Sequence, residues 1–279
     1  MKGCIVIPVY REDLSPEERL SLDSVRKHLS GHETRFVCPE SFRVEEIARG
    51  AERWERFPDH YFAGLDGYNS LLKSTAFYQR FVSHDYILIC QLDCLVLRDE
   101  LQHWMSKGFA YIGAPWFPWH QSERKPGDEL WRCGNGGFSL RNVKAHLKIL
   151  QIVVPKGSIY PLGREAKLKT KNAARERGSY KIRKLWYRVL HPLSVTETVE
   201  ESLRRFPFYE DSFWSIEAPK FDKSFRVPTA VEALPFAFEV DPRWCYEKNK
   251  RKLPFGCHAW AKYDKEFWME VLNKAANAA

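Results

Sequence analysis

The sequence predicts an α/β fold with a mixed, mainly parallel sheet flanked by helices, of a Rossmann-like kind. Two apolar runs, Cys4–Val9 and Tyr86–Cys90, are typical of strands buried on both faces. Between them, residues 15–29 predict a helix, because Pro16 stands in its first turn and Gly31 follows its last apolar residue. Alternating strands and helices predict a doubly wound sheet, in which ligands bind beyond the carboxyl ends of the strands.

Shorter segments add further elements to this sheet. No composition shift divides the 279 residues, so we expect one domain over residues 1–279. The further strands expected are Arg35–Cys38, Phe109–Ile112, Gly137–Leu140, Phe225–Val227 and Ala237–Val240, and the further helices are residues 42–56, Tyr68–Val82 and one beginning at Asp211–Ile216.

The positive charge of the chain is concentrated in one segment. Residues 156–191 hold eleven Lys and Arg against two Glu, so this segment carries +9 whereas the whole chain carries +8. We interpret residues 156–205 as a basic, partly helical insertion in the domain. Such a segment could associate with an anionic membrane surface or recognise an acceptor, or it could be a solvated loop. Because the rest of the chain is close to neutral, nucleic acid is not an expected partner.

The amino terminus and the cysteines favour a cytoplasmic location. The first apolar run is too short for a secretory signal, and no segment of about twenty uncharged apolar residues follows it. The seven cysteines are odd in number and lack close pairs, which favours free thiols in a reducing compartment. We therefore expect a cytoplasmic protein that can be peripheral on the inner face of the membrane.

The strongest motif for chemistry is at the end of the strand Tyr86–Cys90. Gln91 and Asp93 follow it two residues apart, so both side chains can face one site. A carboxylate there can bind a hard divalent cation, which can also bridge a diphosphate. The alternative is an aspartate that caps the following turn.

A second motif is the glycine-rich segment 133–141, Cys-Gly-Asn-Gly-Gly-Phe-Ser-Leu-Arg. Glycines around Asn135 permit positive φ angles and a close approach of backbone to ligand, and the amide can bond sugar hydroxyls. The segment is neither a P-loop nor a dinucleotide-binding fingerprint. The alternative is a tight turn that leads into a strand.

The third motif is the acidic pair Glu210-Asp211 at an expected helix start. A carboxylate beside an acceptor hydroxyl can act as a general base, although helix capping alone also favours acids there. The fourth is His258 in the segment Pro-Phe-Gly-Cys-His-Ala-Trp, which could ligate a metal or pack as a hydrogen-bonded core residue.

The order of these motifs resembles that of GT-A glycosyltransferases. The segments YNSLLKSTAFY, YILICQLDCLVL, YIGAPWF, GNGGFSLR, YEDSFW, ALPFAFE and PFGCHAW also resemble an uncharacterised, glycosyltransferase-like domain family of bacterial polysaccharide gene clusters. The resemblance extends from Ile5 to about Trp260, without the basic insertion. It implies a hexosyltransferase-like enzyme with a GT-A fold, a nucleotide-sugar donor (UDP- or GDP-linked), a divalent metal (Mn²⁺ or Mg²⁺) and a glycan or lipid-linked acceptor.

The resemblance also implies roles for individual residues. Asp93 and His258 correspond to metal ligands, and Glu210 and Asp211 to the acceptor-side pair, with Asp211 the preferred base. Gln91 replaces the first acid of the usual strand-end motif, which leaves one charge fewer beside the metal. The residues implied in donor binding are Val9, Tyr10, Lys73, Gln91, Asn135, Gly136 and Gly137.

Three alternatives remain open at this point. A nucleotidyltransferase usually has a glycine-rich loop after its first strand, and PVYREDLSPEERL has no glycine. A basic module that binds membrane or nucleic acid through residues 156–191 predicts binding without turnover. A catalytically inactive glycosyltransferase relative is indicated by Gln91.

Overall fold

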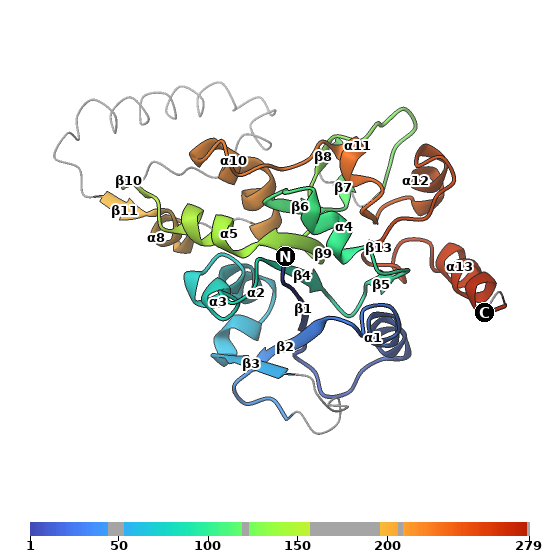
Figure 1. Ribbon diagram of the computed structural model, residues 1–279, viewed down its shortest axis with the longest axis horizontal. Helices are drawn as coiled ribbons and strands as arrows, with labels where there is room; N and C mark the ends of the chain where they lie inside the picture. Colours follow the sequence, from blue (N-terminus) through green and yellow to red (C-terminus); the bar gives the residue numbers. More distant parts are fainter. Residues whose placement is uncertain (44–52, 119–122, 157–195, 206–208, 278–279) are drawn as a thin grey trace, which may run out of the picture.

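The computed structural model describes residues 1–43, 53–118, 123–156, 196–205 and 209–277. Its centre is a six-stranded sheet with the order β3-β2-β1-β4-β9-β6 (Figure 1). Strands β3, β2, β1 and β4 are parallel to one another, and β9 runs antiparallel to β4 and β6. The predicted mixed, mainly parallel α/β sheet is therefore confirmed. Its strands are β1 (Gly3–Pro8), β2 (Glu33–Pro39), β3 (Arg53–Phe57), β4 (Tyr86–Cys90), β6 (Tyr111–Gly113) and β9 (Phe138–Asn142).

Helices flank this sheet, with α1 on one side of β1 and β2 in Figure 1 and α2 and α3 on the other. Helix α1 begins where the sequence predicts, since Ser15 and Glu18 form a reciprocal capping box ahead of it. The helices are α1 (Pro16–His28), α2 (Leu65–Leu71), α3 (Thr75–Gln79), α4 (Leu101–Ser106), α5 (Val143–Leu150), α8 (Val199–Arg204), α9 (Glu210–Ser212), α10 (Ala218–Phe221), α11 (Ala230–Ala233), α12 (Pro242–Lys248) and α13 (Lys265–Asn277), with the 3-10 helix η1 (Asp59–Phe62) and the π-helical turn η3 (Phe213–Glu217).

A smaller sheet of order β12-β13-β5 brings the carboxyl-terminal part of the chain to the end of β4. Its strands are β5 (Leu95–Val96), β12 (Ala237–Phe238) and β13 (Gly256–Cys257). The backbone N–H of Trp260 donates to the Asp93 carbonyl at 3.2 Å, which fixes the segment after β13 beside the segment after β4. The other described strands form two antiparallel pairs: β7 (Pro115–Trp116) with β8 (Arg132–Cys133), and β10 (Val153–Pro155) with β11 (Thr196–Thr198).

Three expected elements are wrong or altered. Of the helix expected over residues 42–56, residues 44–52 lie outside the described part of the chain. Its last residues belong to strand β3 (Arg53–Phe57) instead, because Trp54 stacks on Phe36 and Glu55 pairs with Arg35 on the neighbouring strand. The helix expected over Tyr68–Val82 is divided into α2 and α3, since the Ser74 side chain caps a new helix start. The segment Phe225–Val227 is not a strand, although the Arg226 carbonyl accepts a bond from Ala110 N–H.

Most of the basic insertion lies outside the described residues. Of residues 156–205, the structure describes Lys156 and the segment 196–205, which contains β11 and α8. The helix expected at Lys181–Leu190 also lies outside them. Among the described helices, none is both long and apolar enough to cross a bilayer.

Candidate functional site

A cavity of about 450 Å³ opens beyond the carboxyl ends of β1 and β4. In the parallel part of the sheet, β1 lies between β2, which follows it in sequence, and β4, which follows later. This is a topological switch point, where open α/β sheets bind their ligands. The lining residues are Pro8, Tyr10, Arg11, Leu14, Glu18, Phe62, Gly64, Leu65, Tyr68, Gln91, Leu92 and Asp93.

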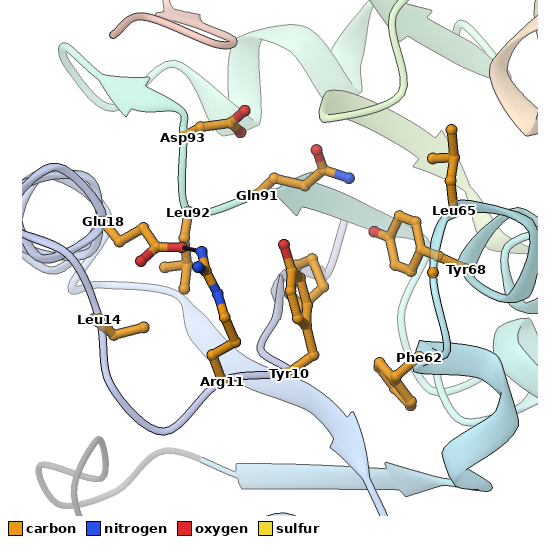
Figure 2. Close-up of a pocket in the computed structure, with 12 residues that line it drawn as sticks. Tyr10, Arg11, Leu14, Glu18, Phe62, Leu65, Tyr68, Gln91, Leu92 and Asp93 are labelled. Atoms are coloured by element: carbon orange, nitrogen blue, oxygen red, sulfur yellow. Dashed lines mark hydrogen bonds and ion pairs between the residues drawn. The ribbon is translucent and has the colours of Figure 1, made fainter. Parts of the chain in front are cut away.

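Figure 2 shows Tyr10 between two walls of this cavity. On one wall Arg11 and Glu18 form an ion pair, and on the other lie Phe62 and Tyr68. The Arg11 guanidinium lies over one face of the Tyr10 ring, and because Tyr10 is 59% exposed, its other face is available to a flat ligand group. Val9, also predicted to bind donor, is buried in the core and does not line the cavity.

The residues predicted to bind a metal meet at the edge of this cavity. Asp93 Oδ1 lies 3.4 Å from His258 Nε2, and Gln91 Oε1 lies 3.3 Å from the same nitrogen. Gln91 and Asp93 come from the end of β4, whereas His258 directly follows β13. Divalent ions such as Mn²⁺ and Mg²⁺ prefer oxygen ligands. The carboxylate and the amide each offer one oxygen here, and the imidazole adds one nitrogen ligand. The donor set therefore fits the predicted metal.

Glu239 is a site residue that the sequence reasoning missed. Its Oε1 accepts from His258 Nδ1 at 2.9 Å and from the Asn135 side-chain amide at 2.8 Å. A carboxylate on one ring nitrogen fixes the orientation of the imidazole and directs the other nitrogen toward a metal. The sequence feature that could have pointed to Glu239 is an acid within an apolar run, Ala237-Phe238-Glu239-Val240.

The charge of His258 depends on these carboxylates. Burial alone lowers its pKa, but Asp93 and Glu239 reverse this effect and raise the pKa to about 9. The imidazole is therefore protonated at neutral pH in the absence of a metal. A metal must displace the proton from Nε2, so its affinity should increase with pH.

The glycines of segment 133–141 are needed for close packing within the site. A Cβ on Gly136 would lie 2.0 Å from Glu210 Oε1, and one on Gly137 would lie 2.2 Å from His258 Nε2. Neither residue has a positive φ, so the expected backbone freedom is not what requires glycine here. Asn135 holds the turn, because its side-chain oxygen accepts from Gly137 N–H at 2.9 Å while its amide donates to Glu239.

The two members of the acidic pair have different environments. Both oxygens of Glu210 accept from Arg141, at 2.8 and 2.9 Å, and the Glu210 N–H donates to Asn69. The Arg141 side chain is fully buried and that of Glu210 is 7% exposed. Glu210 is thus committed to a buried bidentate ion pair, which leaves Asp211 as the carboxylate with free capacity.

We predict that Glu210→Gln lowers the free energy of unfolding by about 3–5 kcal/mol, because it leaves the buried Arg141 charge without its partner. Denaturant unfolding followed by circular dichroism measures this loss. The double variant Glu210→Leu with Arg141→Met should recover part of it, since replacing both charges leaves neither unpaired. A Glu210→Gln protein as stable as the parent would contradict the prediction.

Asp211 is partly exposed at the start of α9. Burial and then the neighbouring Glu210 charge raise its pKa to about 7. It does not cap the helix, since the N-cap residue is Tyr209, although it accepts from Ser212 N–H at 2.6 Å. The following residues form the π-helical turn η3, a feature frequent at functional sites.

Lys73 lies in the break between α2 and α3. It is 5% exposed, and burial lowers the pKa of its amine to about 8, while Glu210 and Asp66 act in the opposite direction. Lys73 does not line the cavity, so its predicted donor contact stays a prediction.

The chain belongs to DUF5672, a family of proteins of unknown function, whose model matches residues 52–258. No curated protein matches it. Among solved structures it is similar to the mannosyltransferase Ktr4p from S. cerevisiae in complex with GDP, with 12% identity and a TM-score of 0.30 over 41% of this chain and 40% of Ktr4p. It is also similar to the galactosyltransferase LgtC in complex with donor and acceptor sugar analogues, with 13% identity and a TM-score of 0.45 over 91% of this chain and 86% of LgtC. The chain spans about two fifths of Ktr4p, and both likenesses concern the fold.

Proposed function

We propose that this protein is a metal-assisted glycosyltransferase that moves a sugar from a nucleotide-sugar donor to a glycan or lipid-linked acceptor. The observation that carries the proposal is the convergence of Gln91, Asp93 and His258 at the edge of a cavity at the switch point of the sheet. The order of these motifs along the chain, which resembles GT-A glycosyltransferases, narrows the reaction class to sugar transfer.

Within this proposal, Asp93 and His258 hold the metal, and Gln91 supplies a neutral oxygen beside them. A bound divalent ion supplies Lewis-acid stabilisation of the leaving diphosphate. Glu239 holds the His258 ring through Nδ1, and the same oxygen holds Asn135, so one carboxylate sets both the imidazole and the glycine-rich turn. Tyr10 offers its ring to the base of the donor.

Asp211 is assigned as the general base of an inverting transfer. It takes the proton of the acceptor hydroxyl, while Glu210 positions it through the buried pair with Arg141. A base with a pKa near the working pH combines a sufficient ionised fraction with sufficient basicity. In a retaining transfer neither carboxylate needs to act as base, so the stereochemistry of the product tests this assignment separately.

The acceptor and the location belong to the same proposal. A lipid-linked acceptor places the enzyme at the cytoplasmic face of a membrane, where the basic residues 156–191 would favour anionic lipids. Sedimentation with anionic vesicles measures this association, and salt-insensitive or absent binding contradicts it.

Thermal unfolding with nucleoside diphosphates tests the donor site directly. We expect one of UDP or GDP, with Mn²⁺, to raise the midpoint, because a ligand of the folded state stabilises it by about 2.7 kcal/mol at a hundredfold excess over its dissociation constant. Neither the nucleotide nor the metal alone should give the full shift. A shift that needs both identifies the donor base. No shift with any nucleotide would favour the binding module, and a shift without transfer to any acceptor would favour an inactive relative.

A further inference from the structure

We infer that Cys4, Glu33 and His84 form a second metal site, for a thiophilic divalent ion such as Zn²⁺. Among the residues that the structure describes, these three offer a thiol sulfur, a carboxylate oxygen and an imidazole nitrogen within 4.8 Å of one another. Sulfur, nitrogen and oxygen ligands of these types are those that zinc takes in proteins.

The site is fixed by the rigid centre of the sheet. Cys4 on β1 and Glu33 at the start of β2 are direct register partners, and His84 lies just before β4, the other neighbour of β1. Cys4 and the His84 side chain are completely buried. The three residues lie at the amino ends of their strands, whereas the cavity with Asp93 lies beyond the carboxyl ends. The two sites therefore lie at opposite ends of the sheet's parallel strands.

The surrounding hydrogen bonds orient the three ligands. Arg35 donates to Glu33 Oε1 at 2.8 Å, while Glu33 Oε2 faces His84 Nε2 at 3.0 Å. The other ring nitrogen, Nδ1, lies 3.3 Å from Ser83 Oγ. Carboxylate and imidazole ligands of metals are commonly held by outer partners in this way. The Cys4 thiol donates to the Ile5 carbonyl at 3.5 Å, and because a thiol is a weak donor this bond can be given up to a metal.

The charge of the cluster allows a divalent ion. Arg35 pairs with both Glu33 and Glu55, so the three groups held inside the cluster together carry −1. Arg53 also lies 3.6 Å from Glu33 and Arg80 3.7 Å from Glu55, but their side chains are 68% and 51% exposed, so solvent screens their charges. A divalent ion bound with loss of the Cys4 thiol proton would bring the sum to zero. Lys2 Nζ is 3.5 Å from Glu33 Oε2, but its side chain is 57% exposed and can turn toward solvent. The ion would join β2, β1 and β4, so its role is to stabilise the sheet.

Cobalt(II) is the probe for this site, because a Co²⁺–thiolate bond gives a charge-transfer absorption in the near ultraviolet. We expect the full chain, freed of metal by a chelator, to develop this absorption on titration with Co²⁺ and to lose it when Zn²⁺ is added. Zn²⁺ should also raise the thermal midpoint of the metal-free protein, since it binds the folded state. A parent protein without a thiolate absorption would overturn the inference.

Two variants identify the thiol. Cys4→Ser should lose the absorption, and Cys94→Ser should keep it. Cys94 is the matched control, because its Sγ lies 3.9 Å from Asp93 Oδ1 in the proposed active site. Loss in Cys94→Ser with retention in Cys4→Ser would assign the metal to the other site. If Cys4→Ser does not fold, His84→Gln should weaken Co²⁺ binding at least tenfold, and unchanged affinity there would contradict the site. Asp93→Asn should keep the absorption, so this test does not depend on the proposed transfer activity.

Discussion

Asp93→Asn should abolish metal-dependent transfer and the metal-dependent part of the nucleotide stabilisation. The change removes the only negative charge among the three groups that face the proposed ion, Gln91, Asp93 and His258. Although the Asp93 side chain is 48% exposed, it pairs with His258 at 3.4 Å, so the unfolding free energy without ligand should fall by about 1 kcal/mol or less. The measurement is the thermal midpoint with the preferred nucleotide, with and without Mn²⁺, together with turnover of the nucleotide-sugar.

Gln91→Asp provides the opposite change at the same site. It adds a carboxylate where Gln91 Oε1 now lies 3.3 Å from His258 Nε2, and we expect tighter Mn²⁺ binding. In both the parent and this variant, Mn²⁺ should bind more tightly at pH 8.5 than at pH 6.5. The reason is that the raised pKa of His258, about 9, makes the metal compete with a proton over this range. An Asp93→Asn protein with parental Mn²⁺ dependence would refute the metal assignment.

The sheet could be predicted from the sequence where burial alone decides the structure. The runs Cys4–Val9 and Tyr86–Cys90 are apolar throughout, and both form strands covered on two faces. Strand β3 could not be predicted in this way, because Arg53–Phe57 is mostly polar. It is held by long-range contacts such as the stacking of Trp54 on Phe36 and the Arg35–Glu55 ion pair. Such contacts leave no local pattern in the sequence.

The residues of the candidate site that follow a strand end could be predicted from the sequence, whereas the other residues could not. Gln91 and Asp93 follow a strand, so their common direction follows from its period of two residues. Glu239 was missed because its function depends on His258 and Asn135, which are 19 and 104 residues away in the sequence. The pairing of Glu210 with Arg141, 69 residues away, likewise separates two acids that look equivalent in sequence.

Asp211→Asn should reduce kcat by about 10²–10⁴-fold, the range for loss of a general base, while nucleotide and Mn²⁺ binding remain. The parent kcat/KM should rise with pH through about 7, because only the ionised carboxylate can take the acceptor proton and its pKa is raised to about 7. The variant should lose this rising limb. Initial rates of sugar transfer over pH 5.5 to 8.5 measure both effects, and a variant with the parental profile would contradict the assignment.

The same raised pKa predicts a gain of stability in this variant. Between the usual pKa of an aspartate, 3.8, and its folded value of about 7, folded Asp211 keeps a proton that the unfolded chain has released. The unfolded state then binds fewer protons, so the free energy of unfolding falls as pH rises across this interval. Asn cannot ionise, so Asp211→Asn should unfold at a higher temperature than the parent at pH 8, with the difference vanishing near pH 4. Loss of the Asp211 carboxylate should thus remove turnover and stabilise the fold, which assigns this residue to the chemistry. Loss of the Glu210 carboxylate should destabilise the fold, which assigns that residue to the buried pair with Arg141.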